Sequence, residues 1–307
     1  MAVLPFDSPA FQVLLCDDTR CRSMIAGRVD VLSLHSISCV SSRLRAPFME
    51  EIIERLKKYT AQYGAPDVFW NYFTEARGIM SGSAVQHFLQ SGQVDRGSTP
   101  THSLDIYVHE DAVQPFVDRL VATGEYGPVK VRGTNPRHAI WYKFRLSILI
   151  FLEKKTDPHS KIVIRGVIDR DGVRSILNAD CTLVMNMITP QAIYCLYPAL
   201  LRQNIGVIQH AFGTTTSYIS QMAARQHIIT DLLAAPQCTR FCPRRLQNFA
   251  DREYASIPLN GGEADAIDHD AEWSFQSREI CTSFDCPHAS TDPIDELMNR
   301  LWIHWDE

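Results

Sequence analysis

Two short segments of the chain carry residue types suited to holding a phosphate group and a metal cation. In the first, Ile79-Met80-Ser81-Gly82-Ser83-Ala84, an apolar run ends at Gly82 and Ser83. Gly82 lacks a Cβ, so a phosphate can approach its backbone, and Ser83 adds a hydroxyl and, at a helix start, free backbone N–H groups. The second segment, 103–108, carries Asp105 within an apolar run, and a carboxylate there is a candidate ligand for a divalent cation.

The position two residues before Asp105 does not supply a second carboxylate. Side chains at i and i+2 of a strand project from the same face, so an Asp-x-Asp pair can share one metal ion. In this chain the pair is Ser103 and Asp105. A serine hydroxyl brings no charge, and Mg²⁺ gives up its water ligands reluctantly. The sequence therefore predicts only weak Mg²⁺ binding at Asp105.

A further carboxylate is also hard to place. The strand-like segment 162–167 contains no acidic residue, while Glu153 ends the preceding strand-like run and Asp169 and Asp171 lie in the turn that follows. Any of these three acids can reach toward Asp105 in principle, although acids in turns are more often solvated.

The elements around these segments alternate between strands and helices from about residue 67 to 210. We expect helices over 83–90, from 110 to Gly124 and from Thr189-Pro190 to 196, and strands over 104–108, 129–131, 139–144, 146–152, 162–168 and 182–187. This pattern predicts an α+β fold, a mixed β-sheet with helices on one face.

The segment before the sheet has a helical pattern. Phe48, Ile52 and Leu56 recur at helical spacing, which predicts an apolar stripe that packs on the sheet. Asp30 is a candidate N-cap, and Glu51–Arg55 and Glu54–Lys58 are expected to pair on the wet face of the same helix.

The chain is expected to have three parts. These are a helical segment over 1–63, a sheet domain over 64–210, and an extension over 211–307 with one helix, over 213–235, and a mostly irregular tail. A short terminal helix is expected over 295–305.

Composition narrows the function classes. Hydrophobic residues make up 45% of the 307 residues, the formal net charge is −5 and the pI is about 6.1, so a large core is expected and a strong nucleic-acid signal is absent. The longest apolar run, 146–152, is too short to span a bilayer, and no targeting segment is visible. We expect a protein of the cytoplasm or nucleus, not secreted and without a membrane partner.

The nine cysteines do not form a compact metal motif. Cys238 and Cys242, followed by Cys281, Cys286 and His288, are spaced more loosely than the Cys-x2-Cys pairs of common zinc modules. The sequence therefore disfavours zinc, and we expect most of these thiols to be free.

Several segments together resemble a known family. These are 31–34 (VLSL), 81–89 (SGSAVQHFL), 104–108 (LDIYV), 181–189 (CTLVMNMIT) and 194–198 (YCLYP), and they are similar to a large family of uncharacterised proteins of mushroom-forming fungi. The resemblance covers roughly residues 30 to 210. Its central block resembles the DNA polymerase β-like nucleotidyltransferase superfamily, and the block before it is similar to the helical F-box.

The superfamily resemblance implies a phosphate-facing turn at Gly82 and Ser83 and a metal ligand at Asp105. Nucleotidyl transfer uses one or two Mg²⁺ ions held by carboxylates on neighbouring strands. Because Ser103 stands where a carboxylate is expected, we interpret the site as catalytically degenerate, binding a nucleoside triphosphate or a protein partner.

Two alternatives remain open at this point. An F-box-like segment implies an adaptor that docks on a ubiquitin ligase and recruits a substrate. An intact set of carboxylates elsewhere in the fold implies an active, metal-dependent nucleotidyltransferase.

Overall fold

A computed structural model describes most of the chain between residues 19 and 208. The described residues are 19–64, 66–91, 103–127, 130–133, 146–168, 172–179, 181–208 and 254–259, together with strand fragments at 228–231, 247–248 and 272–273. The expected strand over 139–144, the terminal helix over 295–305 and the cysteine group after residue 237 lie outside them.

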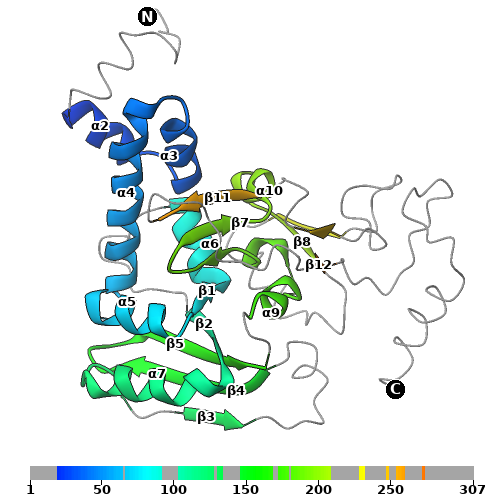
Figure 1. Cartoon of the computed structure of the whole chain (residues 1–307). Helices are drawn as coiled ribbons and strands as arrows, with labels where there is room; N and C mark the ends of the chain where they lie inside the picture. The colour runs from blue at the N-terminus through cyan, green and yellow to red at the C-terminus, as the bar shows by residue number, and fades with distance from the viewer. Residues whose placement is uncertain are drawn as a thin grey trace, which may run out of the picture.

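The fold is built on one mixed sheet of eight strands (Figure 1). Its order is β11-β7-β6-β1-β2-β5-β4-β3, in which β2 and β5 run parallel and the other neighbours run antiparallel. The strands are β1 (Ile79–Ser81), β2 (Leu104–His109), β3 (Lys130–Gly133), β4 (Leu146–Lys154), β5 (Asp157–Val167), β6 (Met187–Ile188), β7 (Ala192–Cys195) and β11 (Ala255–Pro258). The structure therefore confirms an α+β fold with a mixed sheet.

Helices precede, interrupt and follow these strands. They are α2 (Thr19–Ala26), α3 (Val31–Ser38), α4 (Ser42–Ala61), α5 (Pro66–Glu75), α6 (Gly82–Ser91), α7 (Glu110–Ala122), α9 (Val173–Leu177), the 3₁₀ helix η1 (Thr182–Val184) and α10 (Pro198–Arg202). Short pairs also form between β8 (Ile205–Ile208) and β9 (Ile228–Asp231), and between β10 (Gln247–Asn248) and β12 (Glu272–Trp273). The helix expected over 213–235 is therefore wrong at 228–231, which form β9.

The two faces of the sheet bury different clusters. Ile106 and Ile164 pack in the cluster that contains residues of α4, α6 and α7. Tyr107, the next residue along β2, packs in a second cluster with α9. Because neighbouring side chains of a strand point to opposite faces, the long helices cover one face and the short helix α9 lies against the other.

The segment between residues 182 and 196 differs from the expectation. Instead of a strand and then a helix, it forms η1, β6, a tight turn and β7. Thr189 closes the turn, because its backbone N–H donates to the Ala192 carbonyl at 2.9 Å and its hydroxyl accepts from Ala192 N at 3.0 Å. Pro190 follows Thr189 as the first central residue of this turn, the position where a fixed φ is favourable.

The N-terminal helices share a core with the sheet. Phe48, Ile52 and Leu56 of α4 are 0–2% exposed and belong to the same buried cluster as Ile106. Asp30 caps α3 by accepting from Ser33 N at 2.8 Å, as its position predicts. Packing of the helices on the sheet is therefore observed, whereas the domain boundaries proposed near residues 63 and 210 stay predictions.

Arg55 of α4 is buried, so the prediction that it lies on the solvent-exposed face of the helix is wrong. The side chain is 6% exposed, pairs with Glu51 at 2.9 Å and donates to the carbonyls of Val29, at 2.9 Å, and Ala26. The Ala26 carbonyl ends α2, where backbone acceptors lack intrahelical partners, and the Val29 carbonyl lies in the loop before α3. Arg55 thus ties the end of α2 and the loop between α2 and α3 to α4.

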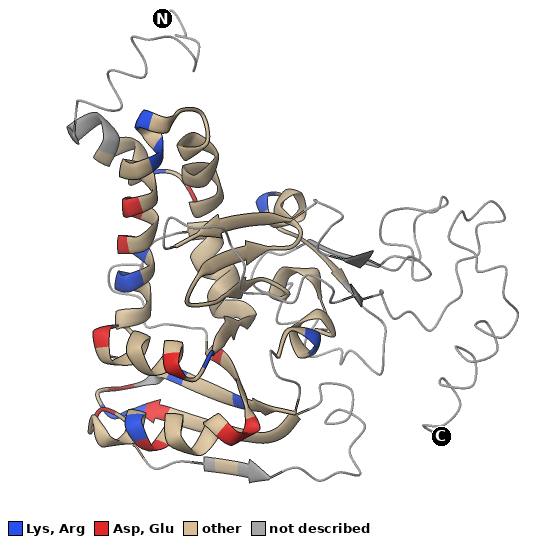
Figure 2. Ribbon diagram, viewed as in Figure 1, with Lys and Arg blue, Asp and Glu red and all other residues tan. Residues whose placement is uncertain are grey.

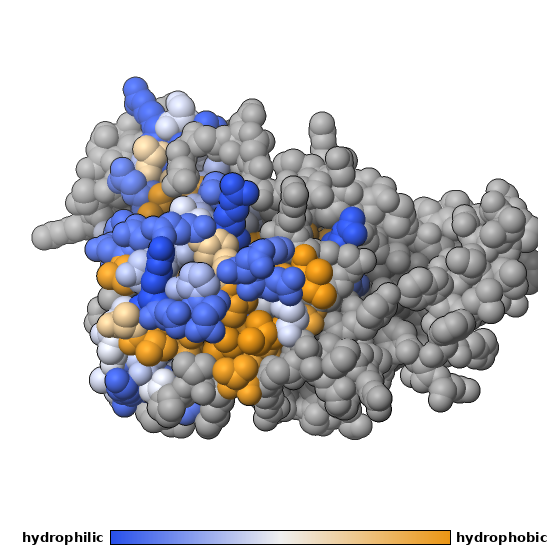
Figure 3. Space-filling view, turned by 60° about the horizontal axis from the view of Figure 1, so that its bottom comes forward, coloured by the Kyte–Doolittle hydropathy of each residue, from blue (hydrophilic) through white to orange (hydrophobic). Residues whose placement is uncertain are grey.

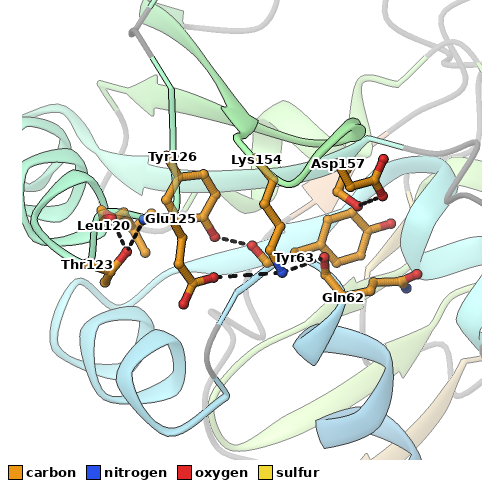
Figure 4. Close-up of polar contacts among 9 residues, drawn as sticks. Gln62, Tyr63, Leu120, Thr123, Glu125, Tyr126, Lys154 and Asp157 are labelled. Carbon is orange, nitrogen blue, oxygen red and sulfur yellow. Dashed lines mark hydrogen bonds and ion pairs between the residues drawn. The ribbon is translucent and has the colours of Figure 1, made fainter.

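Polar contacts fix the residues that follow α4 to β4 and to the loop after α7 (Figure 4). Tyr126 donates its hydroxyl to the Tyr63 carbonyl, and Lys154 of β4 donates to the Gln62 carbonyl at 3.3 Å. Lys154 also lies 3.7 Å from a Glu125 carboxylate oxygen. The first residues after the long helix are therefore held against β4 and the loop that follows α7.

The strands and helices differ in where they carry charged residues. In Figure 2 the strands β1, β6, β7 and β11 are uncharged, while Lys, Arg, Asp and Glu appear along α4, α5, α7 and the β4–β5 pair. Figure 3 shows hydrophobic residues gathered on the end of the molecule that carries α7 and β3 in Figure 1. Exposed apolar side chains there include Val121 and Val131, at 37% and 56% exposure.

Across the part of the chain that the structure describes, no helix is both long enough and apolar enough to cross a membrane.

Candidate functional site

The chain turns sharply from β1 into α6 at Gly82. Its φ is +81°, a left-handed conformation that glycine adopts without the steric cost of a Cβ. The preceding residue, Ser81, is 1% exposed and its hydroxyl points to the carbonyls of Asn186, at 2.7 Å, and Val184, at 3.1 Å. The turn is thus fixed both by its backbone conformation and by a contact with the segment after η1.

Asp105 lies directly beneath this turn. Its strand partner on β1 is Ser81, the residue before Gly82. A Cβ built on Gly82 would stand 2.9 Å from Asp105 Oδ2, closer than an ordinary van der Waals contact. The structure therefore brings Gly82 and Asp105 together, as the two sequence segments led us to expect.

Ser83 and Ser103 occupy the positions that flank this pair. Ser83 is half-buried in the first turn of α6, a helix of 10 residues whose first backbone N–H groups have no intrahelical acceptor. Ser103 is half-buried and immediately precedes β2. Strand β2 thus begins one residue after Ser103, the serine that stands in place of a second carboxylate.

The side chain that reaches Asp105 from the neighbouring strand is an arginine. β5 runs parallel to β2, and Arg165 is in register with Tyr107, two residues beyond Asp105. Arg165 Nη2 lies 3.0 Å from Asp105 Oδ2, and the two side chains are 27% and 15% exposed. The guanidinium carbon also lies 5.6 Å from the centre of the Tyr107 ring, within the range of a cation–π contact.

The electrostatics of this group keep Arg165 charged. Burial alone would lower the pKa of Arg165, but the charges of Asp105 and Tyr107 and the hydrogen bond to Asp105 together raise it. A protonated guanidinium next to a carboxylate gives a pair with no net charge.

Two tyrosines border the pair and are held in the neutral form. Burial raises the pKa of Tyr63 to about 12, and the charge of Asp105 adds to the increase. Burial also raises the pKa of Tyr107 to about 12, while Arg165 and Asp105 act on it in opposite directions. Neither phenol is therefore poised as a base near neutral pH.

Two polar atoms of the pair are left without hydrogen bonds. Asp105 Oδ1 and Arg165 Nε are both buried and have no partner among the described residues. Buried polar atoms are usually satisfied, and an unsatisfied one costs stability. The pair therefore keeps one acceptor and one donor unused.

The other candidate carboxylates do not join Asp105 in the part of the chain that is described. Glu153 lies on β4, on the far side of β5 from Asp105, and pairs with Lys161 at 3.4 Å. Asp169 and Asp171 lie outside the described residues. Within those residues, no three His, Cys, Asp or Glu side chains are grouped to hold a metal ion.

Mg²⁺, which the superfamily resemblance implies, does not fit the residues present here. A Mg²⁺ site in a protein needs carboxylate oxygens that are free to approach the ion. The contact of Asp105 Oδ2 with a guanidinium places a competing positive charge at that ligand.

Sequence reasoning did not identify Arg165 as a site residue. Its signal was a single charge inside the apolar run Ile162-Val163-Ile164-Arg165-Gly166-Val167. A charge in a buried strand needs a partner, and the nearest strand in space supplies it from 60 positions earlier in the chain.

No protein-family model matches the chain, and no curated protein sequence matches it significantly.

Proposed function

We propose that the turn at Gly82 binds the phosphate groups of a nucleotide in a nucleotidyltransferase-type site that has lost catalysis. The observation that carries the proposal is the contact of Asp105 with Arg165, at 3.0 Å, beneath a glycine turn that opens a helix. The turn offers backbone N–H groups and Arg165 offers N–H donors that Asp105 does not use, and both can bind phosphate oxygens.

The loss of catalysis follows from the same pair. Metal-dependent nucleotidyl transfer needs carboxylates that position one or two cations between the attacking and leaving oxygens. Asp105 has Ser103 in place of a second acid and has Arg165 on its Oδ2. Binding of the phosphates therefore remains in this proposal, while activation of the attacking hydroxyl does not.

Calorimetry with ATP tests binding, and release of pyrophosphate from ATP tests catalysis. We expect a saturable heat of ATP binding and no release of pyrophosphate above the buffer rate. The variant Gly82→Ala places a methyl group against Asp105 and is expected to weaken ATP binding. The matched variant Gly124→Ala changes another left-handed glycine, with open space around its Cβ position, and should bind ATP like the wild type.

Two results would overturn the proposal. One is the absence of any ATP binding by folded wild-type protein. The other is release of pyrophosphate that disappears in the Asp105→Asn variant, which would assign active chemistry to this carboxylate.

A further inference from the structure

We propose that Arg165 is the resident cation of this site, so that its anionic ligand binds without a divalent metal. The identity of that ligand as a nucleotide phosphate rests on the proposed function. The exclusion of metal from Asp105 rests on the geometry of Asp105 and Arg165 alone.

The first step is the position of the guanidinium. Arg165 Nη2 contacts Asp105 Oδ2, the same oxygen that lies nearest to the Cβ position of Gly82. A divalent ion on this oxygen would lie against a permanent positive charge at contact distance, inside a site where both side chains are mostly buried. The ion would have to displace Arg165 before it could bind.

The second step is the capacity of the arginine to hold an anion as well. A guanidinium has five N–H donors in a rigid plane. Among the described residues, Asp105 accepts from Nη2 of Arg165 only, and the side chain as a whole is 27% exposed. A phosphate oxygen that reaches the exposed part of the guanidinium would therefore meet a charged donor group without a metal bridge.

The third step is a comparison with Arg119, which also has a carboxylate and a tyrosine ring as its partners. Arg119 of α7 pairs with Glu75 and lies over the ring of Tyr72, with its guanidinium carbon 5.1 Å from the ring centre. Its side chain is 47% exposed and that of Glu75 is 59% exposed. The two groups share a carboxylate, a guanidinium and a tyrosine, but only that of Arg165 lies beneath a glycine turn.

The first experiment measures ATP binding to the wild type by calorimetry in EDTA and again in Mg²⁺. We expect the same dissociation constant within about threefold, since the N–H donors of Arg165 bind the phosphate without a metal bridge. ATP binding that is seen only with Mg²⁺ would overturn the inference while leaving the proposed function intact. No ATP binding in either buffer would instead overturn the proposed function.

The second experiment uses Mn²⁺ alone as the probe, followed by its electron paramagnetic resonance signal. We expect no saturable Mn²⁺ binding to the wild type or to Arg119→Gln. We expect Arg165→Gln to bind Mn²⁺ at least about tenfold more tightly than either, because Asp105 then lacks its cation. Equal Mn²⁺ binding by all three folded proteins would overturn the exclusion of metal by Arg165.

A third variant keeps the test decisive if Arg165→Gln fails to fold. Arg165→Lys retains the positive charge but loses the planar fork of donors. We expect it to exclude Mn²⁺ and to bind ATP in EDTA more weakly than the wild type. Saturable Mn²⁺ binding by Arg165→Lys, or ATP binding that now needs Mg²⁺, would show that a charge at this position does not replace a metal.

Discussion

At the scale of single residues, the site depends on a close approach between a backbone and a carboxylate. Gly82 has a positive φ and no room for a Cβ, because Asp105 Oδ2 would lie 2.9 Å away. Gly124 also has a positive φ, at +76°, but nothing lies within 4 Å of its Cβ position. The chain thus separates the two costs of replacing a glycine: backbone strain and steric overlap.

We expect Gly124→Ala to lower the free energy of unfolding by about 1–2 kcal/mol, the cost of a left-handed alanine. Gly82→Ala should lower it by at least about 1 kcal/mol more, because its methyl group also overlaps Asp105. Urea denaturation of both variants gives the difference. Equal losses would mean that Asp105 moves aside without cost.

The serine before β2 allows the missing carboxylate to be restored. We expect Ser103→Asp to strengthen binding of Mg²⁺ with ATP, measured by calorimetry, because it places a second acid two residues from Asp105. The gain should be larger when Arg165→Gln is also present, since the two changes act on one site and are not additive. Tight Mg²⁺–ATP binding by the wild type, unchanged by Ser103→Asp, would show that another residue supplies the ligand.

Among these residues, the sequence was enough to predict that Gly82, Ser83 and Asp105 belong to one local unit. A strand, a turn, a helix and a returning strand are consecutive, so short-range patterns position them. Arg165 was not predictable in this way, because β2 and β5 meet as a parallel pair from distant parts of the chain. Nothing in the pattern around Arg165 specifies which strand lies beside it.

At the scale of elements, the N-terminal helices complete the core of the sheet. Phe48, Ile52 and Leu56 lie in one cluster with residues of β2 and β5, and Arg55 joins α4 to the end of α2 and to the loop that follows it. The apolar stripe of α4 is therefore already covered within this chain. The adaptor alternative would need these helices to dock on another protein through their remaining surface.

Deletion of residues 1–63 should destabilise the remaining chain, because it removes α4 from the core. Each fully buried apolar side chain contributes roughly 1.5–3 kcal/mol. We expect a lower melting temperature by calorimetric scanning, or no cooperative transition.

A point variant provides the control for this deletion. Phe48→Ala alone should cost about 3–5 kcal/mol, because Phe48 is fully buried. If the truncated chain melts at the temperature of the full chain, the helical segment is an independent module and the adaptor alternative gains weight.

The elements differ in how well the sequence predicted them. The sequence placed α6, α7, β2 and β4 within two residues of their observed bounds, whereas β5 begins five residues earlier than the strand expected over 162–168. The region 182–196 was misassigned because an apolar stretch of this length fits a strand or a helix equally well. The chain turns back here because the backbone N–H of Thr189 donates to the Ala192 carbonyl, which closes a hairpin turn between β6 and β7 in place of a helix.

At the scale of the whole molecule, several buried phenols couple stability to alkaline pH. Burial raises the pKa of Tyr59, Tyr63, Tyr107 and Tyr126 above the ordinary value. The unfolded chain therefore loses these protons first as pH rises. The contribution of the neutral phenols is fully present below about pH 10 and is lost as pH rises through the folded-state values.

We expect the free energy of unfolding to fall steeply between about pH 10 and 12, by about 1.4 kcal/mol per pH unit for each such tyrosine. Tyr107→Phe should reduce this slope by the contribution of one tyrosine, about 1.4 kcal/mol per pH unit, measured by urea denaturation at several pH values. The same variant should leave the pH dependence below pH 9 unchanged. An unaltered alkaline slope in Tyr107→Phe would show that this phenol titrates alike in the folded and unfolded chain.

The edge strand β11 has a consequence for how the protein is made. Ile257 is fully buried and stands opposite Ile193 of β7, yet β11 is translated long after β7. At the usual speed of synthesis, roughly 3–12 s pass between the two strands. During that interval the ribosome-bound chain presents β7 as an uncovered strand edge, open to pairing with a neighbouring nascent chain. Polysomes that translate this sequence therefore hold nascent chains with an exposed strand edge until Ile257 emerges and β11 pairs with β7.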